Sequence, residues 1–286
     1  MMKRLALLMA VGTLFLMMPA VGADLRVRPA YAGNGVPLLI LADVSGSMRE
    51  TMTVPAAEDT DDEDLPKIVA TKRLLLEILA DPALDSRDLG IYRLCHRSGN
   101  PLLYESFLAI GPHGREEVAD WIEEEFAVDY PVFNRRTPLA DALRQIDEDV
   151  LAGMEVPPDI LILSDGKESF YRPGKDRAGT VNPDSDEIVG PVTEIRRLTA
   201  RYGDRMAIHT VFLGDADAPI TEDRVAALIA YFQEETDAAD GRIDGQAVLA
   251  AAAGFGGGER FSGADLLASP ERLDAARARI VQRIDD

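Results

Sequence analysis

The sequence predicts a doubly wound α/β fold with a mainly parallel sheet, one antiparallel edge strand and helices on both faces. Short apolar runs that are typical of buried strands alternate with segments of helical periodicity along most of the 286 residues. The apolar runs are nearly continuous, as in strands that are covered on both faces. Hydrophobic residues make up 47% of the chain, which is enough for a full core.

The first half of the chain supplies two strands of the sheet and its antiparallel edge. Val36 to Ala42 is the first apolar run, and a helical segment follows from Leu65 to Ala80. Leu89 to Cys95 is the next predicted strand, and the turn HRSGN then leads to a short strand within PLLYESF, residues 101–107. The last two runs form a hairpin, so the second of them is expected to be the antiparallel edge strand.

The second half continues the alternation. Helices are predicted over residues 115–126 and 137–151, and in the second of these Thr137 is the expected cap with Pro138 in the first turn. The run DILILSD, residues 159–165, is the next buried strand. A polar loop follows, then a helix near Asp186 to Tyr202, the strand MAIHTVFLG, two further helices, a short strand near Arg260 and a helix from Pro270.

The start of the chain has the pattern of a secretory signal peptide. Lys3 and Arg4 precede an apolar stretch, and Ala23 suits a cleavage site, so we expect a signal over residues 1–23; an uncleaved membrane anchor is the alternative. Residues 24–286 are predicted to form a single domain with its core from about residue 32. No other stretch approaches the ~18 to 20 apolar residues of a membrane span. We therefore expect a periplasmic or secreted protein that is not inserted in the membrane after cleavage.

The net charge and the cysteine and histidine residues limit the classes of partner and of metal site that the sequence predicts. Fifty acidic against thirty basic residues give a formal net charge of −20, which repels nucleic acid and anionic membrane surfaces and favours cationic partners. Cys95 is the sole cysteine and is expected to be a small buried residue, with an intermolecular bridge as the alternative. His96, His113 and His209 lack metal-ligand spacing, and His209 is expected to pack within a strand.

Oxygen-bearing side chains cluster where two of the most apolar strands end. DVSGSM follows the first strand and supplies Asp43, Ser45 and Ser47. Alternate side chains of an extended chain lie on the same face, so these three side chains are expected to point the same way. DILILSDG supplies Asp165. Ligand sites of doubly wound sheets lie beyond the carboxyl ends of the strands, so we expect these groups to converge, with Thr137 as a third hydroxyl.

The predicted donor set suits a divalent cation. Two carboxylates and three hydroxyls are hard oxygen donors, which together with water favour a six-coordinate ion such as Mg²⁺, with Mn²⁺ and Ca²⁺ as alternatives. Gly166 in the same motif is expected to let the backbone turn sharply after Asp165.

The motifs DVSGSM, TPLADAL and LSDGKES, in this order and spacing, resemble the metal-ion-dependent adhesion site of von Willebrand factor type A domains. The resemblance extends to HTVFLGD and to AAAGFGGGERFSGADLL, and so covers most of the chain. It implies a Rossmann-like doubly wound fold and one coordination position that stays open for an acidic side chain of a partner protein. It also implies that the metal binds through the hydroxyls of Ser45, Ser47 and Thr137, with Asp43 and Asp165 acting directly or through water.

Two classes of function remain open at this point. The leading prediction is a metal-dependent protein-binding domain of the cell envelope that is not an enzyme. The alternative is a Mg²⁺-dependent hydrolase or phosphoryl-transfer enzyme in which Asp43 attacks the substrate. Aspartyl phosphatases of the dehalogenase type need a D-x-D pair, but Ser45 stands in the second position, and no G-x-S-x-G, phosphate loop or H-E-x-x-H is present.

An acidic segment, EDTDDED at residues 58–64, lies between the first site motif and the following helix. A solvated loop is the favoured prediction for such a run of charges. An extra cation site and an internal mimic of an acidic ligand are the alternatives.

Overall fold

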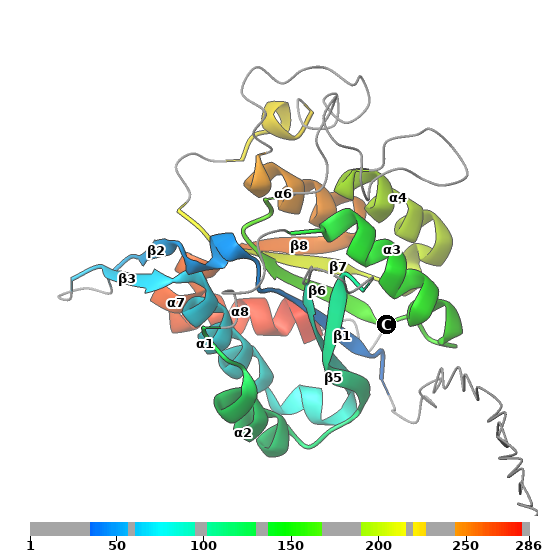
Figure 1. Cartoon of the computed structure of the whole chain (residues 1–286), viewed down its shortest axis with the longest axis horizontal. Helices are drawn as coiled ribbons and strands as arrows, with labels where there is room; N and C mark the ends of the chain where they lie inside the picture. Colours follow the sequence, from blue (N-terminus) through cyan, green and yellow to red (C-terminus); the bar gives the residue numbers. More distant parts are fainter. Residues whose placement is uncertain are drawn as a thin grey trace, which may run out of the picture.

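The computed structural model describes residues 35–56, 61–94, 102–129, 137–167, 190–215, 220–226 and 244–281. Its centre is a six-stranded sheet of order β5-β4-β1-β6-β7-β8 (Figure 1). Within this sheet only β5 is antiparallel to its neighbour, which confirms the predicted sheet type. The strands are Leu38–Asp43 (β1), Asp88–Leu94 (β4), Tyr104–Pro112 (β5), Asp159–Ser164 (β6), Ile208–Phe212 (β7) and Gly257–Ser262 (β8).

Helices cover both faces of the sheet, as the doubly wound prediction requires. Figure 1 shows two groups of helices on opposite sides of the strands. One group consists of α1 (Lys67–Leu79), α2 (Arg115–Glu125), α7 (Gly263–Ala268) and α8 (Pro270–Val281). The other consists of α3 (Leu139–Asp149), α4 (Pro191–Tyr202) and α6 (Gly245–Phe255).

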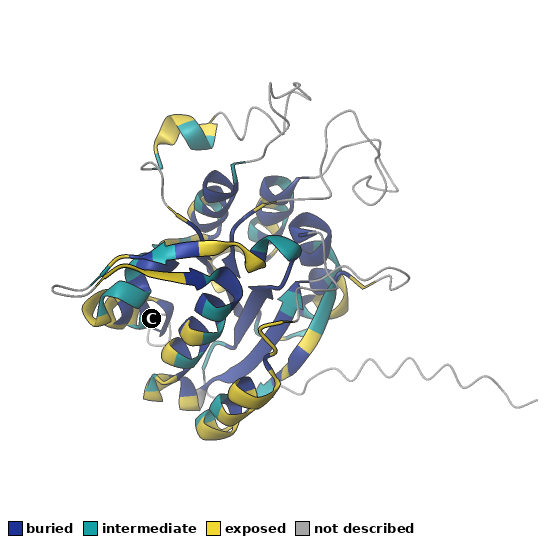
Figure 2. Ribbon diagram, turned by 60° about the vertical axis from the view of Figure 1, so that its left-hand side comes forward, coloured by how far each residue is buried: buried dark blue, intermediate teal, exposed yellow. Residues whose placement is uncertain are grey.

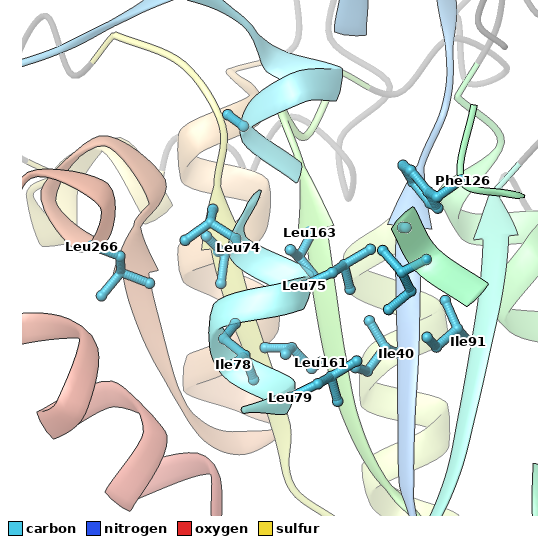
Figure 3. Close-up of a cluster of buried hydrophobic side chains, with 14 of the residues drawn as sticks. Ile40, Leu74, Leu75, Ile78, Leu79, Ile91, Phe126, Leu161, Leu163 and Leu266 are labelled. Atoms are coloured by element: carbon cyan, nitrogen blue, oxygen red, sulfur yellow. The ribbon is translucent and has the colours of Figure 1, made fainter. Parts of the chain in front are cut away.

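Strand β1 is buried along its whole length and packs against both helix layers. Ile40 lies in one apolar cluster, while Leu39 and Leu41 lie in the other, because successive side chains of a strand point to opposite faces. Figure 3 shows Leu75 of α1 beside Ile40 and the β6 strand. The central strands β1, β6 and β7 are buried, while exposed residues gather on the outer faces of the helices (Figure 2). This burial on two faces fixes the strand ends that carry the candidate site.

The connection between β1 and α1 differs from the prediction. A separate antiparallel ribbon of β2 (Thr51–Val54) and β3 (Glu63–Pro66) precedes the helix, so α1 begins at Lys67 instead of Leu65. Met52 and Leu65 are buried in this ribbon. Sequence patterns do not reveal it, because each strand has four residues and β3 combines acidic residues with a proline, which strands usually avoid.

Other elements lie close to their predicted positions, with shifted ends. The edge strand β5 extends to Pro112, beyond the predicted residues 101–107. Thr137 is not the cap of α3: Pro138 occupies that position, and the helix begins at Leu139. The short helix α7 between β8 and α8 was not predicted.

Several predictions fall outside the described residues. These are the signal peptide at residues 1–23, Cys95 with His96, and residues 168–189 of the polar loop. Of the two helices expected between β7 and β8, α6 is described, and the other is described only as a helical turn at residues 222–226. None of the described helices has both the length and the apolar character needed to cross a membrane.

Candidate metal centre

The candidate site lies at the carboxyl ends of two neighbouring parallel strands. β1 and β6 pair in register up to Ala42 and Leu163. Asp43 is the last residue of β1, and Asp165 directly follows the last residue of β6. The register therefore brings both carboxylates to the same end of the sheet, where both residues are buried.

A tight turn after β1 gathers two serines around the first carboxylate. The Ser45 N–H donates a hydrogen bond to Asp43 Oδ1 at 2.8 Å. Ser47 lies in a short 3₁₀ helix, η1 (Gly46–Arg49), and not in the extended continuation that the sequence predicted. The 3₁₀ turn, and not strand alternation, therefore positions Ser47, whose Oγ lies 3.0 Å from Ser45 Oγ.

Thr137 joins these groups from the start of α3. Its Oγ1 lies 3.4 Å from Asp43 Oδ2, and the residue is buried. The hydroxyl is directed toward the carboxylate, while Pro138 takes the cap position of the helix without a side-chain hydrogen bond. The capping role predicted for Thr137 is therefore wrong, and its hydroxyl belongs with the oxygen groups around Asp43.

The turn after β6 positions the second carboxylate. Gly166 has a φ of +70°, a conformation that L side chains rarely adopt, which confirms the sharp turn expected there. Gly245, the first residue of α6, packs directly against this turn. The cap of α6 is Asp244, whose side chain accepts a hydrogen bond from the Ala247 N–H. The start of a helix therefore holds the Asp165 loop in place.

Sequence reasoning missed Ser164, the last residue of β6. Its buried hydroxyl donates a hydrogen bond to Asp43 Oδ2 at 2.6 Å and accepts one from the Gly166 N–H at 2.9 Å. The strand register is the signal that points to it, because Leu163 pairs with Ala42 and the next residues on the two strands are Ser164 and Asp43.

Two lysines and a glutamate also lie beside the second carboxylate. Lys67 Nζ is 3.1 Å from Asp165 Oδ2 and 2.9 Å from Glu50 Oε2. Lys167 Nζ is 2.7 Å from the same Glu50 oxygen and 3.5 Å from Asp165 Oδ2. Hydrogen bonds from Lys167 and then Lys67 hold the pKa of Glu50 below its usual value. No motif spacing links these residues, since Lys67 and Asp165 are 98 positions apart.

Asp43 has a different electrostatic environment from Asp165. Among the described residues, its carboxylate has hydroxyl and amide donors but no basic side chain at ion-pair distance. Burial raises the pKa of Asp43 to about 6, the charge of Asp165 adds to this rise, and hydrogen bonds from Ser164 and Ser45 oppose it. A buried carboxylate in this position lacks a compensating positive charge.

The donor set fits a hard divalent cation. Every candidate group is an oxygen, and contacts of 3.4 Å or less link four of the five candidate residues. Within the described ranges, no three or more His, Cys, Asp or Glu side chains are grouped so as to hold a metal ion. Hydroxyls would therefore complete the coordination. The five candidate ligand residues are Asp43, Ser45, Ser47, Thr137 and Asp165.

The described part of the acidic segment divides between a loop and the ribbon: Asp61 and Asp62 are exposed and precede β3, as predicted for a solvated loop. Glu63 and Asp64 lie in β3, with exposed side chains as predicted but in a strand. Asp64 accepts a hydrogen bond from Thr53 Oγ1 at 2.9 Å, and Glu63 pairs with Arg73 at 2.8 Å. These contacts correct the prediction of a solvated loop for residues 63 and 64.

The described histidines do not approach the site. His209 is buried in β7, and its Nδ1 accepts a hydrogen bond from the Glu259 N–H at 3.1 Å, which confirms the packed strand residue predicted there. His113 follows β5, where its Nε2 lies 2.8 Å from the Ala109 carbonyl oxygen.

Comparisons with known proteins show relationships in structure alone. No family model matches the chain, and no curated protein matches its sequence. An aerotolerance-related membrane protein from Bacteroides fragilis superposes with a TM-score of 0.51 and 14% identity, covering 87% of this chain and 100% of that one. The conserved hypothetical protein BatB from Bacteroides thetaiotaomicron superposes with a TM-score of 0.50 and 12% identity, covering 87% and 98%.

A weaker likeness involves proximal thread matrix protein 1 of the mussel byssus, solved with a zinc-occupied MIDAS motif. It has a TM-score of 0.44 and 10% identity over 88% of this chain and 47% of that one. At such low identities the comparisons establish the fold alone. The chain has an α/β fold of the von Willebrand factor A-like type, with a mainly parallel sheet between two helix layers.

Proposed function

We propose that this chain is a metal-dependent protein-binding domain of the cell envelope and not an enzyme. In this proposal a divalent cation at the candidate metal centre completes its coordination with an acidic side chain of a partner protein. The hydroxyls bind the cation, and the two carboxylates act directly or through water. The proposed ligands are Asp43, Ser45, Ser47, Thr137 and Asp165.

One observation carries the proposal: Asp43 is a fully buried carboxylate surrounded by hydroxyls, with no described basic side chain paired to it. Burying a charge without a partner is costly, so such a group either stays protonated or meets a cation. Hydroxyls from separate segments of the chain surround it with the oxygen donors that Mg²⁺ prefers. Mn²⁺ and Ca²⁺ are the alternatives.

The charge balance explains why a partner would be bound through an acidic group. The site offers at most two carboxylates to offset the charge of a dication, and neutral hydroxyls do not reduce that charge further. An open coordination position then attracts one external carboxylate. The net charge of −20 argues against nucleic acid as the partner.

The location follows from the predicted signal peptide, which would direct the domain to the periplasm or the exterior without membrane insertion after cleavage. The similar Bacteroides fragilis structure is that of an aerotolerance-related membrane protein, which is compatible with a role at the envelope.

The metal is tested by calorimetric titration of the purified protein with Mg²⁺ and Mn²⁺. Asp43→Asn keeps the shape of the side chain and removes its charge, so it is expected to abolish binding. Asp120→Asn changes an exposed carboxylate of α2 and serves as the control, with binding unchanged. Binding by the wild type that survives in Asp43→Asn contradicts the proposed site.

Partner binding is tested by affinity capture from an envelope extract of the source organism, with and without chelator. Capture is expected to require metal and to be lost in Asp43→Asn. The competing function is tested on the same protein, since metal-dependent hydrolysis of a phosphate or ester substrate would contradict the binding function and favour the enzyme.

A further inference from the structure

Lys67 places a buried positive charge beside the candidate metal centre. It is the first residue of α1, and its side chain is 6% exposed. The ammonium lies between Asp165 Oδ2 at 3.1 Å and Glu50 Oε2 at 2.9 Å. An ammonium so deeply buried is tolerated because carboxylates compensate its charge.

The backbone holds Lys67 in this position. Its N–H donates a hydrogen bond to the Glu50 carbonyl oxygen at 3.0 Å, and its own carbonyl oxygen accepts one from Thr71 Oγ1 at 2.9 Å. The first contact ties the start of α1 to the segment that follows η1. A backbone hydrogen bond therefore connects the lysine to the segment that continues from the loop of Asp43 and Ser45.

The two carboxylates of the site are thus unequally compensated. Lys67, Lys167, Glu50 and Asp165 contribute two positive and two negative charges, and their contacts of 3.5 Å or less form a closed neutral cluster. Asp43 stands outside this cluster. A divalent cation that enters the site meets a single uncompensated carboxylate, together with the repulsion of a nearby ammonium.

We propose that the Lys67 ammonium is a resident cation of this site. It holds Asp165 in place without metal, and it lowers the affinity of the site for a divalent cation. This inference rests on the proposed metal-binding function, because it assigns the residue that sets the strength of that binding. Removing this ammonium leaves Lys167, at 3.5 Å, as the remaining basic contact of Asp165, so the carboxylate becomes more available to the metal and the repulsion decreases.

The test compares Lys67→Met with the wild type by titration with Mg²⁺ and Mn²⁺. Methionine is an unbranched side chain one atom shorter than lysine and carries no charge, so the affinity is expected to rise by about tenfold or more, the effect of one charge at close range in a partly buried site. Lys72→Met is the matched control: it lies in the same helix and pairs with Glu123 at 3.4 Å, so it leaves the affinity unchanged.

Thermal unfolding provides a readout that does not depend on the affinity. In chelator, Lys67→Met is expected to melt below the wild type, because Asp165 loses a buried partner. Added Mg²⁺ is expected to restore most of this loss. A melting temperature that stays low in Mg²⁺, with metal affinity equal to or below that of the wild type, overturns the inference and leaves Lys67 with a structural role only.

A second variant keeps the test decisive if Lys67→Met does not fold. Glu50→Gln removes an exposed carboxylate that compensates the two lysines, so it is expected to weaken Mg²⁺ binding, the opposite direction to Lys67→Met. Unchanged binding in Glu50→Gln contradicts the inference. If the wild type binds Mg²⁺ and both variants bind it with the same affinity, the inference is refuted and the proposed function stands. If neither the wild type nor Lys67→Met binds any divalent cation, the proposed function is refuted as well.

Discussion

Gly245 meets the carbonyl oxygen of Asp165 so closely that a Cβ on the glycine would lie 2.1 Å from that oxygen. The contact joins the first residue of α6 to the loop that carries the second carboxylate. Gly166 faces the same contact from the other side, where a Cβ would lie 2.0 Å from the Gly245 carbonyl oxygen. The position of Asp165 therefore depends on the absence of side chains at both glycines.

Gly245→Ala is expected to destabilise the protein by about 1–3 kcal/mol, the usual range for an atom forced into a packed site, and to weaken Mg²⁺ binding by displacing Asp165. Urea denaturation and calorimetric titration measure the two effects. The same helix supplies the control, because a Cβ on Gly254 would meet nothing within 4 Å. Gly254→Ala is expected to raise the free energy of unfolding by about 0.5–1 kcal/mol, since alanine loses less entropy than glycine in a helix. A Gly245→Ala protein as stable as Gly254→Ala contradicts the packing described here.

Ser164 links the two strands of the site through one hydroxyl, which bonds both Asp43 and the Gly166 N–H. Ser164→Ala leaves both partners buried with one bond fewer, a loss of about 1–3 kcal/mol in the free energy of unfolding. It also removes a donor that favours the charged form of Asp43, so the affinity for Mg²⁺ is expected to fall. Denaturation and titration in parallel check both effects. Ser164→Thr retains the hydroxyl and is expected to preserve more of the affinity, and equal metal binding in Ser164→Ala and the wild type would remove this residue from the site.

The sequence is informative about the strands and the oxygen groups at their ends, because buried parallel strands need continuous apolar runs. The run LLILA leads directly to Asp43, and DILILS leads to Asp165. In-register pairing of two such strands brings their ends together, which places both acids at one edge of the sheet.

Other parts of the site depend on tertiary contacts that local patterns do not encode. Ser47 is positioned by a 3₁₀ turn, while a strand pattern would have continued past it. Lys67 at the start of a helix would ordinarily be solvated, and only the folded chain brings it to Asp165. The ribbon β2–β3 also cannot be predicted from the sequence pattern, because four-residue strands with acidic residues and a proline carry little strand signal.

Asp141 in α3 provides a prediction about pH. The residue is 6% exposed, and its Oδ2 has no hydrogen-bond partner among the described residues. Burial raises the pKa of Asp141 to about 6, Arg144 opposes the rise, and Glu194 of α4 adds to it. The ordinary value is 3.8. Between these values the folded protein retains a proton that the unfolded chain releases.

The contribution of Asp141 to the free energy of unfolding is therefore expected to fall as the pH rises from 4 to 6, because this residue binds more protons in the folded state than in the unfolded state. A rise in pKa of about two units corresponds to at most about 3 kcal/mol of lost stability above pH 6. Asp141→Asn cannot ionise, so it is expected to be more stable than the wild type at pH 7 and to differ little from it at pH 4. Urea denaturation at pH 4, 5, 6 and 7 in chelator measures this difference without a contribution from metal. Asp120→Asn, which changes an exposed carboxylate of α2, is expected to follow the wild-type curve. An Asp141→Asn protein less stable than the wild type at pH 7 would mean that the charged form of Asp141 is favoured by the fold, the opposite of what its burial predicts.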